Sequence, residues 1–253
     1  MFVQRPACRM MSGALWLQGV YEAAMIDSRP AYVTTVHYVK EVILEGVADY
    51  AYWQAHLAPE GLTPFRDADR AVLLLSATRL RWMGLRFNEL SISVALCERD
   101  DCAESDAAYL LHAFNSRTAL AWMERRFFRT PYFRADFDFD YEQPAHFGVS
   151  AGGQPLVRAA MSRRTTPAIP DMQHWEGQVY LPPRDDTPRR DRFFAGLGGE
   201  TQVFPFRASD TVELFPYPDV PVVQWLRESG FAGREWRLRT GATHAKARTE
   251  RWK

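Results

Sequence analysis

Lysine is nearly absent from this sequence. It occurs only at Lys40, Lys246 and Lys253, although lysine and arginine together number 31. Chemistry that depends on a nucleophilic amine, such as imine formation with a carbonyl compound, therefore has three candidate side chains. An excess of one charge sign is also missing, because 31 acidic residues balance the basic ones. Nucleic-acid binders and proteins that dock on anionic membranes usually carry a basic surface, so neither nucleic acid nor membrane is a predicted partner.

Long apolar runs are absent as well. A membrane-spanning helix needs about 18 or more consecutive apolar residues, and no stretch approaches that length. The apolar run over residues 10–20 is interrupted by polar residues and precedes no clean cleavage site, so a signal peptide is not expected. We expect residues 1–30 to be an N-terminal extension, frayed as chain termini often are, and residues 31–253 to form one domain.

Cysteine is scarce, and cofactor motifs are missing. Cys8, Cys97 and Cys102 are odd in number, and their spacing fits no zinc site or disulfide framework. We therefore expect reduced thiols in a cytoplasmic protein, with Cys97 as a small core residue at the end of an apolar run. There is no phosphate loop, Rossmann glycine pattern, nucleophile elbow or zinc-ligand pattern, so the sequence predicts no cofactor and no metal site.

Apolar residues are plentiful, at 47% of the chain, of which aromatic residues form a large part. This supports a core that needs neither disulfides nor metals. Turn residues separate many short segments of β-forming residues, and helical spacing is rare. The predicted strands cover residues 31–43, 71–79, 85–97, 107–114, 135–141, 146–150, 155–162, 173–181, 201–206, 211–215, 234–239 and 244–252. Short helices are predicted over 49–57 and 222–228, with charged loops over 99–106 and 184–192. Such an order favours a barrel or two packed sheets.

The strand over residues 85–97 alternates clearly. Leu90, Ile92 and Val94 share one face, and Glu89 lies on the other with two serines. The ordinary interpretation is a polar face in solvent. The alternative is that Glu89 points into a cavity, where burial would raise the pKa of its carboxyl and suit it to proton transfer.

Residues 115–141 form the best-defined unit of the sequence. Asn115 or Ser116 can begin a helix with a broad apolar stripe, and Pro131 should end that helix and start an extended segment. Asp136, Asp138 and Asp140 then alternate with aromatic residues. Their spread along a strand predicts a solvated face rather than a metal site. His244 and Lys246, two residues apart on a late strand, should share a face and can either line a pocket or meet solvent.

Two of these segments carry a family resemblance. They read LRFNELSISV, from Leu85 to Val94, and YLLHAFNSRTALAWMERRFFRTPYFRADF, from Tyr109 to Phe137. Their order and spacing resemble the acetoacetate decarboxylase-like superfamily, in particular its uncharacterised bacterial branch, over about residues 32–252. The resemblance implies a single antiparallel β-barrel with an internal cavity and a few outer helices, a mostly β (α+β) fold. It also implies that Glu89 points into the cavity.

The same resemblance carries one departure. Decarboxylases of this family form a Schiff base through a lysine just after the corner proline, whose pKa is lowered by a neighbouring lysine and the apolar cavity. Here Tyr132 and Phe133 occupy the matching positions, and neither side chain can form an imine. The family's decarboxylation mechanism is therefore not expected for this chain.

Three hypotheses follow for function. The first is a cavity that binds a small, anionic organic ligand, or an enzyme acting on a keto acid without Schiff-base chemistry. The second is a non-catalytic structural or interaction protein whose barrel is filled by aromatic side chains. The third is a lyase or decarboxylase that recruits Lys40 or Lys246 from another strand. Barrels of this family often associate, so a homo-oligomer is compatible with all three.

The first hypothesis assigns roles to seven residues. Glu89 is the catalytic candidate. Arg134 is suited to a ligand carboxylate because its guanidinium can donate two parallel hydrogen bonds. The predicted ligand-binding set consists of Tyr132, Phe133, Arg134, Asn88, His112 and His244.

Overall fold

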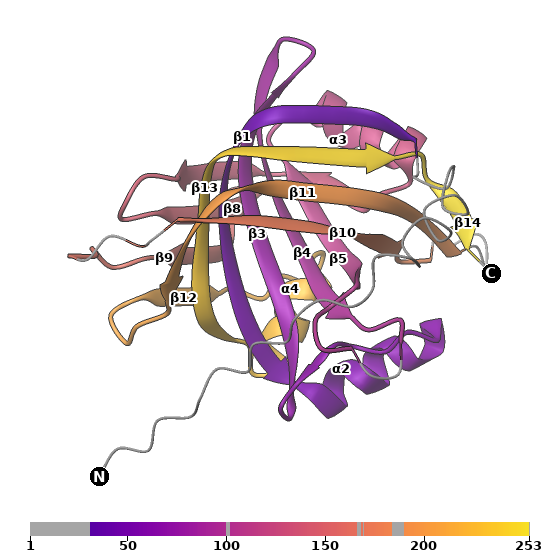
Figure 1. Ribbon diagram of the computed structural model, residues 1–253, viewed down its shortest axis with the longest axis horizontal. Coiled ribbons are helices and arrows are strands. Elements are labelled where there is room, and N and C mark those ends of the chain that lie inside the picture. The colour runs from indigo at the N-terminus through magenta and orange to yellow at the C-terminus, as the bar shows by residue number, and fades with distance from the viewer. Residues whose placement is uncertain (1–30, 100–101, 166–167, 169, 184–189, 253) are drawn as a thin grey trace, which may run out of the picture. The chain divides into compact units, whose positions relative to one another are not determined.

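The computed structural model describes residues 31–253 except 100–101, 166–167, 169, 184–189 and 253. The expected N-terminal extension, the Cys8 thiol and most of the charged loop over 184–192 lie outside the described residues. Residues 32–253 form one compact unit. Most of its described residues are in strands, which confirms that the fold is mostly β (Figure 1).

A large sheet carries most of the chain. Its strands are β1 (Tyr32–Asp49), β2 (Arg66–Asp67), β3 (Arg70–Trp82), β4 (Leu85–Leu96), β5 (Ala107–Asn115), β6 (Tyr132–Arg134), β10 (Asp171–Leu181), β11 (Arg190–Pro205), β13 (Ala232–Ala247) and β14 (Glu250–Trp252). A smaller sheet contains β7 (Asp136–Asp140), β8 (His146–Ala151), β9 (Gln154–Ala160) and β12 (Thr211–Leu214). The helices are α2 (Tyr50–Leu57), the 3₁₀ turn η2 (Ala58–Glu60), α3 (Thr118–Met123), the π-turn η3 (Glu124–Phe128) and α4 (Pro221–Glu228).

The pairings of the large sheet close on themselves. The order runs β1-β13-β11-β10-β5-β4-β3, and β3 pairs with β1 in turn. Seven strands therefore form a hydrogen-bonded ring. The expected purely antiparallel arrangement is wrong in two places, because β5 runs parallel to both β10 and β6. The chain crosses over through α3 between β5 and β6, and through the small sheet between β6 and β10. Each crossover brings the chain back beside β5 in the direction of β5, so both pairings are parallel.

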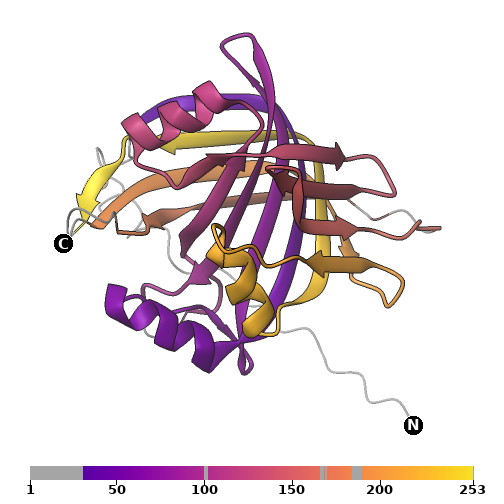
Figure 2. The ribbon, with the colours of Figure 1, turned by 180° about the vertical axis from the view of Figure 1, so that it is seen from behind.

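One face of the ring is covered by the other layers. In Figure 2 the small sheet and α4 lie in front of β1, β3 and β4, and α2 and α3 lie at opposite ends of these strands. The apolar residues of β4, Leu90, Ile92 and Val94, are completely buried in the largest core cluster. That cluster also takes in Trp53 of α2 and Leu226 of α4. The opposite face of β4, which carries Glu89, is therefore turned away from this core.

The unit over residues 115–141 differs from its prediction at the helix. Asn115 remains in β5, and its Oδ1 accepts a hydrogen bond from the Arg117 backbone N–H at 2.7 Å. The helix thus starts only at Thr118, and Arg129, in the left-handed region at φ 59°, ends it two residues before Pro131. The segment after Pro131 is extended as expected. Asp136, Asp138 and Asp140 are exposed on β7, which confirms the predicted solvated face.

A buried ion pair joins the small sheet to the ring. Arg164, after β9, and Asp210, before β12, approach within 2.6 Å, and their side chains are 1% and 0% exposed. The indole N–H of Trp236, on β13, donates to the same carboxylate at 3.0 Å. Burial raises the pKa of Asp210, but hydrogen bonds from Arg164 and Ser162 outweigh it and hold that pKa well below its usual range.

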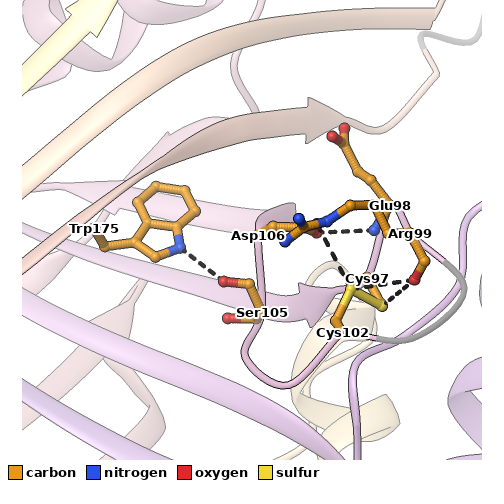
Figure 3. The surroundings of a disulfide bond; sticks show 7 residues. All are labelled: Cys97, Glu98, Arg99, Cys102, Ser105, Asp106 and Trp175. Atoms are coloured by element: carbon orange, nitrogen blue, oxygen red, sulfur yellow. Dashed lines mark hydrogen bonds and ion pairs between the residues drawn. A yellow bond between two sulfur atoms is a disulfide. The ribbon is translucent and has the colours of Figure 1, made fainter. Parts of the chain in front are cut away.

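The expected reduced thiols are corrected by the structure. Cys97 and Cys102 form a disulfide across the turn between β4 and β5 (Figure 3). Cys97 is the first residue beyond β4. The prediction that it is a core residue is therefore wrong. Asp106 organises the same turn, because its carboxylate accepts from the Glu98 backbone N–H at 2.8 Å and from Arg99 at 3.0 Å. Two cysteines close together in the sequence can pair across one turn without belonging to a larger set of disulfides. The cysteine spacing was compared with such larger sets, and this local pair was therefore missed.

The Cys102→Ser variant tests this disulfide. Closing so short a loop should stabilise the native state by about 2 kcal/mol by restricting the unfolded chain. We expect urea unfolding under oxidising conditions to show a loss of that size. Wild-type protein in dithiothreitol should match the variant, and the variant itself should not respond to dithiothreitol. Equal stability of the two proteins without reductant would contradict the bridge.

Candidate functional site

The uncovered face of β3 and β4 differs from the covered face in accessibility. On β4, Glu89, Ser91 and Ser93 each keep some accessible surface, while the residues between them are buried. On β3, Leu74 and Ser76 alternate in the same way with buried neighbours. A strand whose one face is sealed and whose other face is reachable borders an open space on the second side. We call this second side the inner face.

A row of polar side chains crosses the inner face on five neighbouring strands. Residues directly opposite one another in antiparallel strands project to the same side, about 5 Å apart. The registers place Arg239 opposite Glu41, Glu41 opposite Thr78, Thr78 opposite Glu89 and Glu89 opposite Asn115. We call these five residues, Arg239, Glu41, Thr78, Glu89 and Asn115, the polar row.

Glu89 is held by two hydrogen bonds. The Asn115 side-chain amide donates to Oε1 at 2.8 Å, and the Tyr132 hydroxyl donates to Oε2 at 3.3 Å. Asn115 is completely buried, so it fixes one carboxylate oxygen firmly. The other oxygen faces Tyr132, which is only partly buried. Glu89 thus has one oxygen held by a completely buried partner and the other by a partly buried one.

The surroundings of Glu89 favour its protonated form. Burial raises the pKa of its carboxyl to about 8, and the negative charge of Glu124 adds to the increase. Lys246 and the hydrogen bonds from Asn115 and Tyr132 oppose this but do not cancel it. A carboxyl with a pKa of about 8 exchanges protons readily near neutral pH, which is the property expected of a general acid or base.

Lys246 reaches the same site from β13. Its ammonium donates to Glu124 Oε2 at 2.7 Å and lies over the rings of Phe128 and Phe193, at 4.3 and 4.6 Å from their centroids. Its charge acts on Glu89 although β1 and β3 separate their strands in the ring order. Lys246 and Glu89 therefore approach each other from different strands of the ring.

The corner at Pro131 supplies the remaining groups. The Thr130 hydroxyl donates to Glu124 Oε2 at 2.6 Å, and Tyr132 follows Pro131 directly. Burial raises the pKa of Tyr132 well above its usual value, and the neighbouring Glu89 adds to this. Tyr132 therefore keeps its proton and can donate a hydrogen bond. We call the group of Glu89, Asn115, Tyr132, Glu124 and Lys246 the acid–lysine cluster.

A second charged group lies on the β1 side of the polar row. Glu41 accepts from Ser76 at 2.8 Å and from Arg239 at 2.9 Å, and His244 Nε2 lies 3.4 Å from it. Burial raises the pKa of Glu41, but the charges of His244 and Arg239 and the hydrogen bonds from His244 and Ser76 outweigh it and set that pKa at about 2. Glu41 is therefore a permanent anion, in contrast to Glu89 on the same row.

The structure distributes the other predicted site residues around the corner. Phe133 is 44% exposed and stacks on His112 at 4.8 Å between centroids. Burial lowers the pKa of His112 to about 4, so this ring is neutral at physiological pH. Arg134 pairs with Asp136 at 2.6 Å on an exposed edge, and Asn88 accepts from Arg79 at 3.2 Å. Of the seven predicted site residues, Glu89 and Tyr132 are the two that belong to the acid–lysine cluster, and there they contact each other.

Two members of these groups had a detectable signal in the sequence. Asn115 ends an otherwise apolar strand, and Glu41 interrupts the buried run of β1. Both are polar residues within apolar strands, which are informative because burial without a partner is unfavourable. Glu124 had no such signal, because a glutamate in a helix is ordinary and its pairing with Lys246 depends on the tertiary fold.

Filling of the ring by aromatic residues is only partly observed. Trp122 and Phe133 are 53% and 44% exposed, whereas Phe87 is buried beside α3.

Among the described residues, no group of three or more His, Cys, Asp or Glu side chains is arranged to hold a metal ion. In the same part of the chain, no helix is long and apolar enough to cross a bilayer.

Comparisons with known proteins give structural neighbours only. No family model matches the sequence, and no curated protein matches it. Acetoacetate decarboxylase from Legionella pneumophila superposes with a TM-score of 0.61 at 13% identity, covering 96% of this chain and 98% of that chain. An acetoacetate decarboxylase-like enzyme from Sphingomonas wittichii RW1 gives a TM-score of 0.56 at 12% identity, covering 87% and 92%.

A third neighbour was solved with a ligand. The enduracididine biosynthesis enzyme MppR, complexed with the condensation product of pyruvate and imidazole 4-carboxaldehyde, gives a TM-score of 0.55 at 12% identity and covers 98% of both chains. At identities this low, the comparisons establish the fold, which is acetoacetate decarboxylase-like. They confirm the resemblance at that level.

Proposed function

We propose that this chain is an enzyme that binds a small keto acid at the acid–lysine cluster and transfers a proton at the carbon next to its carbonyl, without Schiff-base chemistry. The observation that carries this proposal is Glu89, a carboxyl with a pKa of about 8 on a side chain that keeps some accessible surface on the inner face. A purely structural carboxylate would be expected to have its pKa lowered by its partners, as Glu41 has.

The groups around Glu89 have complementary roles in this proposal. Ionised Glu89 removes a proton from the carbon next to the carbonyl. Lys246 and Tyr132 stabilise the negative charge that develops on the enolate oxygen, since both present donors on the side of Glu89. Protonated Glu89 then returns a proton to the same carbon, so that the keto acid is regenerated with an exchanged hydrogen. The neighbour that holds a condensation product of pyruvate supports a keto acid as the ligand class.

Exchange with deuterium tests the proposal directly. Pyruvate, 2-oxobutyrate and acetoacetate would each be incubated with the protein in D2O, and loss of the proton signal next to the carbonyl would be followed by NMR. We expect exchange above the buffer rate for at least one of them. Exchange at the buffer rate for the whole panel would overturn the proposed reaction.

Lys246 supports a second candidate function, a lyase that forms an imine at this position. The observation in its favour is that Lys246 lies in the acid–lysine cluster although it is far from the corner in the sequence. The amine would attack the ligand carbonyl and release water. Against this, the Lys246 nitrogen is already engaged by Glu124 and packed over two aromatic rings, which hinders its attack on a carbonyl. Borohydride reduction with the same keto acids should therefore leave the protein mass unchanged, and an adduct on Lys246 would favour the imine.

The Lys246→Met variant separates a charge role from a nucleophilic role. Loss of a charged hydrogen-bond donor should weaken exchange by about 10–100-fold. It should also move the pH midpoint of the remaining activity above the wild-type value, because Lys246 lowers the pKa of Glu89. Lys40→Met is the matched control, since Lys40 donates to the Thr240 carbonyl and lies over Tyr141. Unchanged exchange in Lys246→Met would contradict the assigned role.

A further inference from the structure

The inner face carries three serines next to the polar row. Ser76 and Ser91 lie directly opposite each other on β3 and β4, and Ser93 follows two residues beyond Ser91. Each keeps some accessible surface. We call Ser76, Ser91 and Ser93 the serine ladder. It begins two residues from Glu89 along β4, so a ligand held by Glu89 would extend along it.

The hydrogen bonding of the serine ladder is incomplete. Ser76 donates to Glu41, but the hydroxyls of Ser91 and Ser93 make no hydrogen bond within the described part of the chain. On the same face, Thr78 is 5% exposed, and its Oγ1 has no partner among the described residues. Buried polar groups are normally paired, so this side of the polar row lacks partners that a ligand can supply.

The charges of this region define which group can enter. Glu41 is an anion already paired with Arg239, so the polar row leaves no unpaired cation to hold a second carboxylate at the serine ladder. A hydroxyl group both donates and accepts, and it can pair with the serine hydroxyls and with the unpartnered Thr78 hydroxyl. A neutral hydroxyl therefore fits the charges and the free hydrogen-bonding groups together.

We propose that the serine ladder is a second subsite, which binds a hydroxyl group of the ligand. The ligand is then a hydroxylated keto acid, with its carbonyl at Glu89 and Tyr132 and its hydroxyl at Ser91. The identity of the reacting end rests on the proposed function, whereas binding of the hydroxyl by Ser91 does not.

A matched pair of ligands tests the subsite. Binding of 2-oxobutyrate and 4-hydroxy-2-oxobutyrate to the full chain would be measured by calorimetry, together with deuterium exchange. We expect the hydroxylated acid to bind about tenfold more tightly, and the Ser91→Ala variant to lose this preference while binding 2-oxobutyrate as before. Ser150→Ala, on β8 of the small sheet, is the matched control and should keep the preference. Circular dichroism and urea unfolding would show that both variants fold.

The outcomes separate the two proposals. Equal affinity for the two acids, or a preference that survives Ser91→Ala, overturns the subsite even when exchange is observed. Tight, Ser91-dependent binding of the hydroxylated acid without exchange supports the subsite and overturns the proposed reaction. Failure of both acids to bind overturns the subsite, and absence of exchange in that case overturns the reaction as well.

Discussion

The Glu89→Gln variant is expected to lose proton exchange on keto acids by about 10²–10⁴-fold, because an amide cannot act as the base. Glutamine keeps the size of the side chain and can still accept from Asn115, so the ligand should bind with similar affinity. The wild-type rate should rise with pH below about 8 and level off above it, since the ionised carboxyl is the active form. NMR exchange rates between pH 6 and 9.5 would measure both effects.

The same variant has a consequence for stability that does not depend on any ligand. The folded pKa of Glu89 lies above its ordinary value, so the contribution of Glu89 to stability is most favourable below about pH 4.5 and falls as the pH rises towards 8. Glu89→Gln should remove this loss and be more stable than wild type at pH 8. Glu213→Gln, at an exposed position of β12, is the matched control and should change neither stability nor exchange. A wild-type pH profile retained in Glu89→Gln would show that another group is the base.

The Asp210→Asn variant is expected to lose about 3–5 kcal/mol of unfolding free energy, because it leaves the buried Arg164 guanidinium without its counter-charge. The indole of Trp236 donates to the same carboxylate, so tryptophan fluorescence during urea unfolding would report the loss. The pKa of Asp210 is lowered in the folded state, so its contribution is present above about pH 4. The difference between wild type and variant should therefore shrink as the pH falls below that value.

An exposed pair of the same residue types provides the control. Arg66 and Asp69 form an ion pair whose side chains are 56% and 87% exposed. Asp69→Asn should change stability by no more than about 0.5 kcal/mol, because water already solvates both charges. Equal losses in the two variants would mean that Arg164 and Asp210 are solvated in the native protein.

The sequence predicted strands well where one face is sealed. The alternation of Leu90, Ile92 and Val94 predicted β4 within one residue, because burial of one face is a local property of the pattern. The length of β11, which runs from Arg190 to Pro205, was not predicted. Its glycines and charges look like a loop, and only pairing with β10 and β13 makes them a strand. Parallel pairing of β5 was missed for the same reason, since it depends on contacts between distant segments.

The candidate site was predictable only in part. Glu89 and Tyr132 were recognised because a motif places them near each other, and the structure joins them by a hydrogen bond. Lys246 was noted for its position on a strand, but its pairing with Glu124 could not be derived, because β13 and η3 are far apart in sequence. Arg134 was expected to serve a ligand carboxylate, whereas it pairs with Asp136 on an exposed edge. That role remains a prediction.

The closed ring has a consequence for how copies of the chain can meet. Each of its seven strands has a neighbour on both sides, although β10 and β5 pair at only three positions, so most of the ring has no strand edge to offer another molecule. Such edges remain in the small sheet, at β7 and β12. On β7, Asp136, Asp138 and Asp140 are exposed in alternation. A second β7 laid alongside would bring like charges together, so these carboxylates protect an otherwise open edge against aggregation.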